Sequence, residues 1–244
     1  MLKKLIFIFC WISLMATPVQ AATLRVACAA NFTSPMKELA KQYRSATGDK
    51  IACTFGSTGM LYGQIINGAP YDLFFAADEK RPNMLFDQRQ AERPVLYAKG
   101  TVVVWSAKTA LASMPNWKEV VLAPASKRVG MASPKTAPYG LNAEKAMRTT
   151  GILKTVTPKL AYGKSVGVSF QYAYSRAVDS AFIALSQALS DKGLEGRYWI
   201  VPEADLVNQA ACVLKRGNTQ DAAKFLKWLN SNTAREIITR YGYE

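Results

Sequence analysis

The feature of this sequence that most constrains its fold is a regular alternation of short apolar runs with segments of helical periodicity. After the first run, Met36, Leu39, Ala40 and Tyr43 recur at the spacing of one helix face, which ends near Gly48. Strands that alternate with helices in this way predict an α/β fold with mainly parallel sheets. The predicted strands are 24–28, 51–55, 72–76, 101–105, 128–132 and 210–214, and 180–185 is either a buried strand or the start of a helix.

The alternation occurs twice, which predicts two lobes, each with a sheet flanked by helices. The first half of the pattern ends near Ala98-Lys99-Gly100, and we expect the chain to return to the first lobe near Asp205. Residues 22–99 and 206–244 then form lobe 1, and residues 100–205 form lobe 2. About 100 residues are enough for each lobe to have a core of its own. The two crossings predict a hinge made of two strands.

The first 21 residues have the features of a secretory signal peptide. Two lysines precede an apolar run over residues 5–16, and Val19-Gln20-Ala21 supplies the small residues of a cleavage site. The run is shorter than the roughly 20 residues of a membrane span, which argues against the alternative of an uncleaved anchor. We therefore expect cleavage after Ala21 and an exported, soluble mature chain.

The charge of the chain favours an anionic ligand. It has 31 Lys and Arg residues, 17 Asp and Glu residues and no histidine, a formal charge of +14 at pH 7. Loss of the signal peptide removes Lys3 and Lys4 and lowers this charge to +12. A positive field of this size attracts anions. The basic residues are scattered, without a dense tract or an aromatic platform, so we expect no nucleic-acid partner.

The mature chain contains three cysteines, Cys28, Cys53 and Cys212, so they cannot all pair internally. Their spacing does not fit a metal site. Cys28 and Cys53 lie at matching depths of two strands that we expect to be neighbours, which leaves a bridge between them open, because sequence does not supply the Cα separation. We expect all three to serve as small buried apolar residues.

Four turns between a strand and a helix could hold an anion. They lie at 29–35, 56–59, 136–140 and 163–167. Free backbone N–H groups and the helix dipole favour negative charge at a helix N-terminus. Open α/β sheets bind ligands outside the carboxyl ends of their strands, where all four turns are expected. Capping and turn chemistry also explains each turn taken alone, but their convergence favours an anion site.

The side chains of these turns supply mostly uncharged donors. Asn31 offers an amide, Ser57 and Thr58 offer hydroxyls, and Tyr139 offers a phenolic O–H. A half-buried core tyrosine is the alternative reading of Tyr139. Lys164 could supply charge, although a solvated surface lysine is the more common case.

Several stretches of the chain resemble the periplasmic molybdate-binding protein family, a branch of the two-lobed solute receptors. They occur in the order and spacing of that family across the whole mature chain. The matching stretches are Ala29-Ala30-Asn31-Phe32-Thr33, Gly56-Ser57-Thr58-Gly59, residues 67–78 (NGAPYDLFFAAD), Ala137-Pro138-Tyr139-Gly140 and residues 181–187 (AFIALSQ).

The resemblance implies a periplasmic-binding-protein type II fold with a ligand cleft between the lobes. It implies that Asn31 and Thr58, with Ser57 beside it, donate to an oxyanion from lobe 1. Tyr139 and the backbone N–H of Val166 donate from lobe 2. The metal of the oxyanion then has no direct side-chain ligand, and no cofactor is expected.

Two positions depart from the family pattern. Ala30 stands where a relative with the Asn form has a hydroxyl residue, and Ala184 stands where other members have a tyrosine. Tyr139 takes over the second role in the branch that carries the APYG turn. The full donor set therefore stays open.

The function implied by the resemblance is capture of molybdate or tungstate and delivery to the membrane permease of an ABC transporter. We expect the protein to be a periplasmic monomer and not an enzyme. Amide and hydroxyl dipoles in a dry cleft can replace the hydration of a dianion. The same fold holding sulfate, phosphate or an organic anion is the nearest alternative. A serine hydrolase built on Ser57 or Ser165 is a distant one, because neither serine lies in G-x-S-x-G and the chain lacks histidine.

Overall fold

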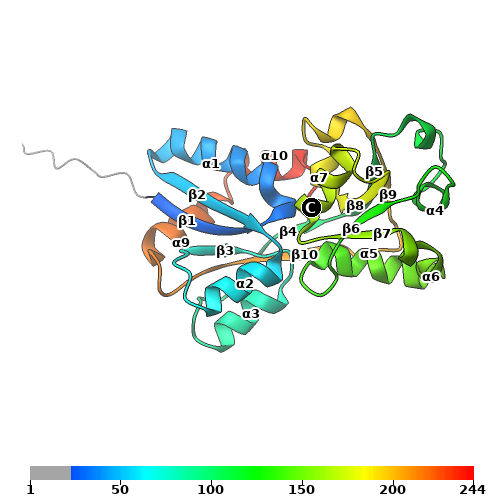
Figure 1. Ribbon diagram of the computed structural model, residues 1–244. Helices are drawn as coiled ribbons and strands as arrows, with labels where there is room; N and C mark the ends of the chain where they lie inside the picture. The colour runs from blue at the N-terminus through cyan, green and yellow to red at the C-terminus, as the bar shows by residue number, and fades with distance from the viewer. Residues whose placement is uncertain (1–22) are drawn as a thin grey trace, which may run out of the picture.

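The computed structural model describes residues 23–244, so the predicted signal peptide and its cleavage after Ala21 lie outside the described residues. The described chain is a two-lobed α/β protein, and each lobe is built on one five-stranded sheet with helices around it (Figure 1). Among the described residues, no helix is long and apolar enough to cross a membrane.

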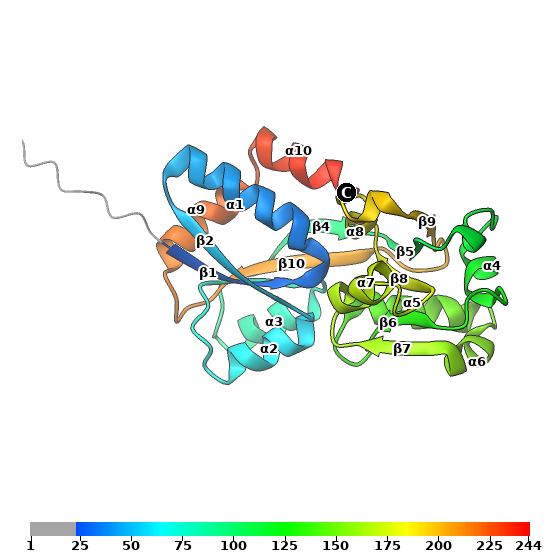
Figure 2. The ribbon, with the colours of Figure 1, turned by 45° about the horizontal axis from the view of Figure 1, so that its top comes forward.

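The sheet of the first lobe has the strand order β2-β1-β3-β10-β4. Strand β1 pairs in parallel with β2 and with the central strand β3, whereas β10 pairs antiparallel with β3 and with β4. Figure 2 shows β4 and β10 side by side where the chain passes between the lobes. The strands are β1 Thr23–Ala29, β2 Lys50–Gly56, β3 Leu73–Phe75, β4 Val95–Gly100 and β10 Val207–Val213.

The sheet of the second lobe repeats this arrangement with the order β7-β6-β8-β5-β9. β6 pairs in parallel with β7 and β8, and β5 pairs antiparallel with β8 and β9. The segment 180–185, which the sequence left open, is a strand followed by a short helix. The strands are β5 Val102–Ser106, β6 Val129–Ala132, β7 Leu160–Gly163, β8 Ser180–Ala184 and β9 Arg197–Ile200.

Both sheets are mixed, so they are less uniformly parallel than the alternation predicted. Two of the four strand pairs in each sheet are antiparallel, and all of these involve β5 or β10. β5 follows the first passage between the sheets and β10 follows the second. These two strands enter their sheets from the other lobe, whereas helical crossovers within a lobe produce parallel neighbours.

The helices begin and end where the local sequence supplies caps. Gly48 ends the first helix in the left-handed region at φ 84°, a conformation that glycine adopts without steric cost. Ser165 caps α7, and its side chain accepts a hydrogen bond from Val168 N–H. The first lobe carries α1 Thr33–Thr47, α2 Thr58–Ile66, α3 Lys80–Asp87, α9 Thr219–Trp228 and α10 Asn232–Arg240. The second lobe carries α4 Trp117–Leu122, α5 Pro138–Thr149, α6 Leu153–Val156, α7 Val166–Tyr174 and α8 Leu185–Ala188.

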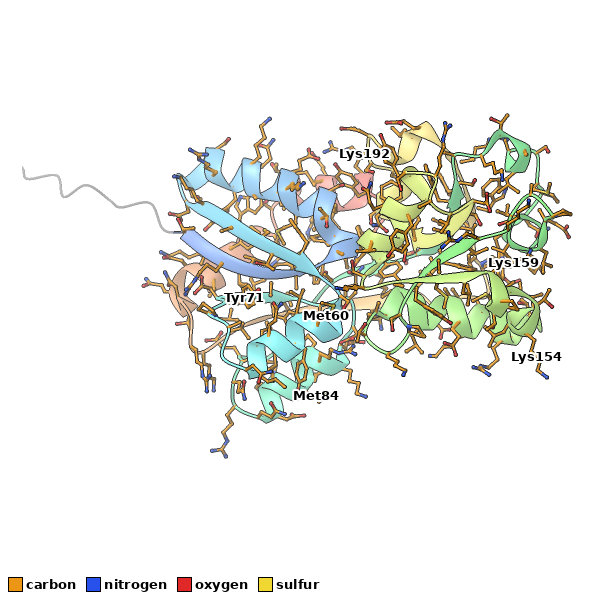
Figure 3. All side chains as sticks on the ribbon, in the orientation of Figure 1. Met60, Tyr71, Met84, Lys154, Lys159 and Lys192 are labelled. Atoms are coloured by element: carbon orange, nitrogen blue, oxygen red, sulfur yellow. The ribbon has the colours of Figure 1, made fainter. Side chains whose placement is uncertain are left out.

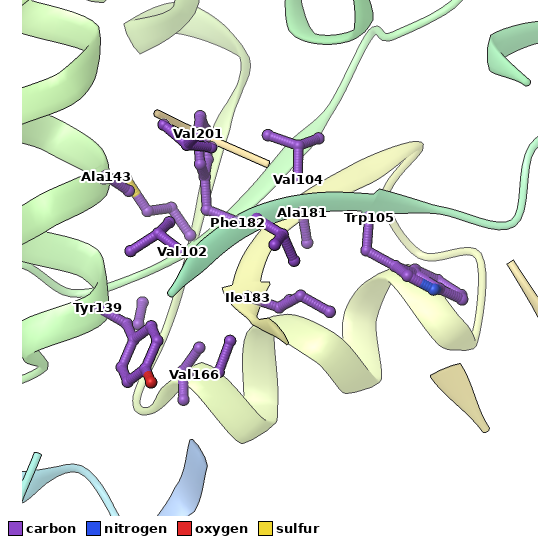
Figure 4. Packing of buried hydrophobic residues seen from close by; sticks show 14 of the residues in the cluster. Val102, Val104, Trp105, Tyr139, Ala143, Val166, Ala181, Phe182, Ile183 and Val201 are labelled. Carbon is purple, nitrogen blue, oxygen red and sulfur yellow. The ribbon is translucent and has the colours of Figure 1, made fainter. Parts of the chain in front are cut away.

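Each lobe has a core of its own. In the second lobe, Trp105 and Phe182 are buried among valines of β5, and Tyr139 and Val166 lie at one end of this cluster (Figure 4). In the first lobe, Phe32 packs against Tyr97 and Tyr243 with ring centroids 4.9 and 5.2 Å away. Full burial of one such side chain stabilises the fold by about 1.5–3 kcal/mol. The two cores hold fixed the strand ends from which the candidate site is built.

The three cysteines of the described chain are free. β1 and β2 are neighbours as predicted, but their register pairs Cys53 with Val26 and Cys28 with Phe55, so the two cysteines are not at matching depths. Burial raises the pKa of the Cys28 thiol well above its usual value and that of Cys53 and Cys212 to about 12. The thiols therefore stay protonated. Cys28 and Cys212 are buried as predicted, whereas Cys53 is only partly buried.

Candidate functional site

The residues predicted to bind an anion surround one small cavity between the lobes. The empty volume between its lining atoms, open solvent included, is about 190 Å³, and it lies where β1, β2 and the helices α5 and α7 meet. It is lined by Ala29, Ala30, Asn31, Gly56, Ser57, Thr58, Ala77, Ala137, Pro138, Tyr139 and Val166. The structure thus brings together all five predicted site residues, which come from four separate turns.

Ser57 and Thr58 enter the cavity from the turn between β2 and α2. Ser57 occupies the position before α2, but its side chain makes no capping hydrogen bond. Its hydroxyl is buried and has no hydrogen-bond partner in the described part of the chain. An unpaired buried hydroxyl costs about 1–3 kcal/mol, so the arrangement is explained only if this group has another task.

The Thr58 hydroxyl oxygen already accepts one hydrogen bond from the protein. Ala77 N–H donates to Thr58 Oγ1 at 3.0 Å, and Thr58 is fully buried. Because a hydroxyl carries one hydrogen and two lone pairs, Thr58 can still donate. Ser57 and Thr58 therefore present two adjacent hydroxyl donors to the same space.

Tyr139 and Val166 face the cavity from the second lobe. Both begin helices: Tyr139 follows Pro138 at the start of α5, and Val166 is the first residue of α7 (Figure 4). Burial raises the pKa of Tyr139 well above its usual value, and the neighbouring Tyr243 raises it further. Tyr139 therefore keeps its proton and can act as a neutral donor; with 2% of it exposed it is more buried than the half-buried alternative supposed, and its ring belongs to the core of the second lobe.

Asn31 lines the cavity from the start of the helical segment after β1, but its amide is held by protein groups. Asn31 Nδ2 donates to Gln209 Oε1 at 2.6 Å and to Tyr243 OH at 2.9 Å. The main-chain carbonyl oxygen of Asn31 accepts from Ser186 Oγ at 2.7 Å. Both hydrogens of the side-chain amide are thus used by protein groups. The sequence predicted Asn31 as a free donor, and this engagement was not expected.

A buried polar network behind the cavity escaped the sequence reasoning. Gln209 on β10 contacts Asn31, Tyr97 and Tyr139, and Tyr243 contacts Asn31. Gln209 lies one residue before the strand predicted to start at position 210. The available signal was a glutamine directly before an apolar run, but the exposed Asn208 beside it has the same polar character, and nothing in the sequence marked Tyr243.

The lobes touch around the cavity through hydrogen bonds between main-chain and side-chain groups. Gly59 N–H at the start of α2 donates to the Thr136 carbonyl oxygen at 2.9 Å. A Cβ atom on Gly59 would lie 3.0 Å from the Thr136 backbone, so glycine permits this close approach. Ser186 of α8 reaches the carbonyl oxygen of Asn31 on the opposite side. The lobes therefore enclose the cavity from two sides.

The lining contains no Asp, Glu, Lys or Arg residue. The charged pair Asp78 and Arg81 lies outside it, in an adjoining groove. Lysines are dispersed over the surface, as Lys154, Lys159 and Lys192 show on the second lobe (Figure 3). Within the described residues, no cluster of His, Cys, Asp and Glu could hold a metal ion directly. The arrangement suits a small ligand that accepts hydrogen bonds.

Other hollows on the described chain are larger. One with an empty volume of about 1340 Å³ lies between β4, α9 and α10, with Leu226 and Ile238 among its lining residues. In the described part of the chain, none of its lining side chains has a buried polar atom without a hydrogen-bond partner. The small cavity is the better candidate because its donors are removed from water, where a hydrogen bond to a charged ligand is strongest.

Comparison with known proteins of similar sequence identifies the family. Residues 24–244 match the family described as bacterial extracellular solute-binding protein. The chain belongs to this family. It is 38% identical to the molybdate-binding protein ModA of Azotobacter vinelandii over 94% of this chain and 93% of the relative. It is 37% identical to the protein of the same name from Rhodobacter capsulatus over 94% and 91% of the two chains.

Two solved structures align with most of the chain. The periplasmic molybdate-binding protein of Azotobacter vinelandii aligns with a TM-score of 0.85 and 33% identity, covering 91% of this chain and 98% of that one. The sulfate-binding protein SubI from Mycobacterium tuberculosis aligns with a TM-score of 0.78 at 12% identity, over 91% and 86% of the two chains. The second likeness shows the fold alone. The comparisons thus establish the predicted type II fold.

Proposed function

We propose that this protein captures molybdate or tungstate in the periplasm and delivers it to the membrane permease of an ABC transporter. The named relatives at 37–38% identity are molybdate-binding proteins, and the cavity has the donors that a tetrahedral oxyanion needs. The observation that carries the proposal is the buried Ser57 hydroxyl, which has no partner among the described residues and opens on this cavity.

Neutral donors are sufficient to hold a doubly charged ion. Amide and hydroxyl dipoles that are fixed in a dry site replace the hydration shell of the ion without reorganising. The lining has no carboxylate to repel a dianion, and the net positive charge of the chain raises the encounter rate with anions.

We assign the donor roles to Ser57, Thr58, Tyr139 and the backbone N–H of Val166. Each lines the cavity, and the three side chains are uncharged and buried. Asn31 belongs to the site as a lining residue whose amide is anchored by the network behind it. Ala30 adds only a methyl group to the lining, and Ala184 is not part of it.

The remaining features of the proposal concern the whole protein. We propose a monomer without a cofactor that performs no catalysis, exported by a signal peptide cleaved near Ala21. We propose lobe limits at 22–99 with 206–244 and at 100–205, supported by the strand order of the two sheets. A hydrolase is disfavoured because the Ser57 hydroxyl touches no base, and Ser165 serves as a helix cap.

Isothermal titration of the purified mature protein with molybdate, tungstate, sulfate and phosphate tests the proposal. We expect one-site binding of molybdate and tungstate, with sulfate and phosphate bound far more weakly or not at all. Binding of sulfate or phosphate in preference to both metal oxyanions would show that the site serves another anion. Absence of binding by any tetrahedral oxyanion would refute the function, and hydrolysis of a generic ester that is lost in Ser57→Ala would replace it with an enzyme.

A further inference from the structure

Gln209 is a fully buried amide in the middle of strand β10, and it lies directly behind the cavity. A buried amide without partners would cost several kcal/mol, but this side chain is bonded at both ends. It contacts Asn31 and Tyr97 through its oxygen and Tyr139 through its nitrogen. The donor and acceptor in each of these bonds decide whether the Tyr139 hydroxyl donates its hydrogen to Gln209 or keeps it for another partner.

The direction of each hydrogen bond in this network can be worked out from the main-chain carbonyl oxygen of Asn31, because a carbonyl oxygen can only accept. It accepts from Ser186 Oγ at 2.7 Å, and Tyr243 OH lies 3.1 Å from it. The Tyr243 hydroxyl also lies 2.9 Å from Ser186 Oγ, so its one hydrogen is used by Ser186 Oγ or by this carbonyl oxygen. In either case its oxygen accepts from Asn31 Nδ2 at 2.9 Å. The Asn31 amide is thereby oriented with its nitrogen inward, and its second hydrogen goes to Gln209 Oε1 at 2.6 Å.

The orientation of Asn31 fixes that of Gln209. Gln209 Oε1 accepts from Asn31 Nδ2, and Tyr97 OH lies 3.0 Å from the same oxygen and 3.3 Å from the Ala76 carbonyl oxygen, so its hydrogen is shared between the two. With its oxygen held by the Asn31 amide, Gln209 presents its nitrogen to Tyr139 OH, at 3.4 Å. A primary amide nitrogen donates and does not accept, so the Tyr139 oxygen is the acceptor of this bond.

We propose that Gln209 is a positioning residue for oxyanion capture, which turns the hydrogen of Tyr139 toward the cavity by donating to the Tyr139 oxygen. This inference rests on the proposed function of the cavity. Gln209 belongs to β10 of the first lobe and Tyr139 to α5 of the second, so the bond forms only when the lobes are together. Closure of the lobes and preparation of the Tyr139 donor are then one event.

The same device makes the site selective for unprotonated anions. Gln209 fills the acceptor side of Tyr139, and Ala77 N–H fills one acceptor position of Thr58. Both hydroxyls are therefore directed to donate. An oxyanion that carries a proton, such as hydrogenphosphate, must place its own hydrogen against a donor and loses one hydrogen bond.

A double-mutant cycle tests the coupling between Gln209 and Tyr139. The variants are Gln209→Met, Tyr139→Phe and the double mutant, each titrated with molybdate by calorimetry after thermal unfolding without ligand confirms that it folds. We expect each single change to weaken affinity about tenfold or more, and Gln209→Met to change affinity less than about twofold in the Tyr139→Phe background. Gln187→Met is the matched control, because this buried amide contacts Val166 and its effect should persist in that background.

The pH profile of Gln209→Glu supplies a second readout that a merely structural role would not move. An ionised glutamate accepts from Tyr139 and draws its hydrogen away from the cavity, whereas the protonated form can still donate. Molybdate affinity of this variant should rise as pH falls from 9 to 6, while that of the wild type stays constant. If Gln209→Met does not fold, this profile decides the question.

The outcomes separate this inference from the proposed function. Wild-type protein that binds no oxyanion would remove both. Wild-type binding with equal losses from Gln209→Met in the two backgrounds, or a flat pH profile for Gln209→Glu, would overturn the role of Gln209 and leave the proposed function standing.

Discussion

Replacement of Ser57 by alanine should separate ligand binding from folding, because the two respond in opposite directions. In this arrangement of the lobes the Ser57 hydroxyl is buried without a partner among the described residues, which carries a desolvation cost of about 1–3 kcal/mol. Ser57→Ala removes that cost. In a protein of this size each kcal/mol shifts the melting temperature by about 2–4 °C, so the ligand-free variant should melt no lower than the wild type and up to several degrees higher.

The affinity for molybdate should fall in the same variant. A hydrogen bond to a charged group contributes about 1.5–3 kcal/mol, and about 1.4 kcal/mol corresponds to tenfold in the dissociation constant. Ser57→Ala should therefore weaken binding about tenfold to 150-fold. Differential scanning fluorimetry without ligand and calorimetric titration with molybdate measure the two effects on one protein preparation.

Ser126→Ala is the matched control for this prediction. The Ser126 and Ser180 hydroxyls are both fully buried and lie 3.0 Å apart, away from the cavity. Removing Ser126 Oγ takes this partner from Ser180, so the control should be destabilised by about 1–3 kcal/mol with unchanged molybdate affinity. The reasoning is wrong if Ser57→Ala behaves in the same way, losing ligand-free stability while binding normally.

Three further changes have distinct expected outcomes. Thr58→Val should both weaken molybdate binding and lower ligand-free stability by about 1–3 kcal/mol, because Ala77 N–H loses its acceptor; calorimetry and urea unfolding measure the two losses, and unchanged affinity would exclude Thr58 from the donor set. Gly100→Ala should reduce affinity at least tenfold, since its Cβ would lie 2.0 Å from the Tyr139 hydroxyl oxygen; titration at wild-type affinity would contradict this packing. Burial alone would raise the pKa of Asp72, but hydrogen bonds from Arg25 and Asn218 more than offset it and hold the pKa below its usual value. The stability that this carboxylate contributes is thus present above its unfolded pKa of about 4 and is lost as pH falls further. Between pH 7 and 3, the free energy of unfolding measured in urea should therefore fall less steeply for Asp72→Asn than for the wild type. Equal dependence on pH would refute the assignment.

The order of strands and helices could be predicted from the sequence because hydrophobic periodicity is a local property. The runs 24–28 and 51–55 became neighbouring strands, and the helix with Met36 and Tyr43 buries both of these side chains. The mixed strand directions could not be predicted, because they depend on which strand the chain meets after it passes between the lobes. Local pattern gives the type of an element but not the direction of its partner.

The candidate site divides in the same way. Its turns could be located from glycines, hydroxyl residues and helix starts, together with the resemblance of short motifs to one family, and the described chain gathers these turns around one cavity. What each side chain does there depends on neighbours distant in sequence: Asn31 is engaged by Gln209 and Tyr243, which are 178 and 212 residues away. The Ser57 hydroxyl has no partner in residues 23–244, although the same residue type caps α7 at Ser165. By itself the sequence determined which donors stand at the strand ends, whereas the tertiary structure alone decided which are already paired, because a hydrogen bond depends on the position and direction of both of its partners.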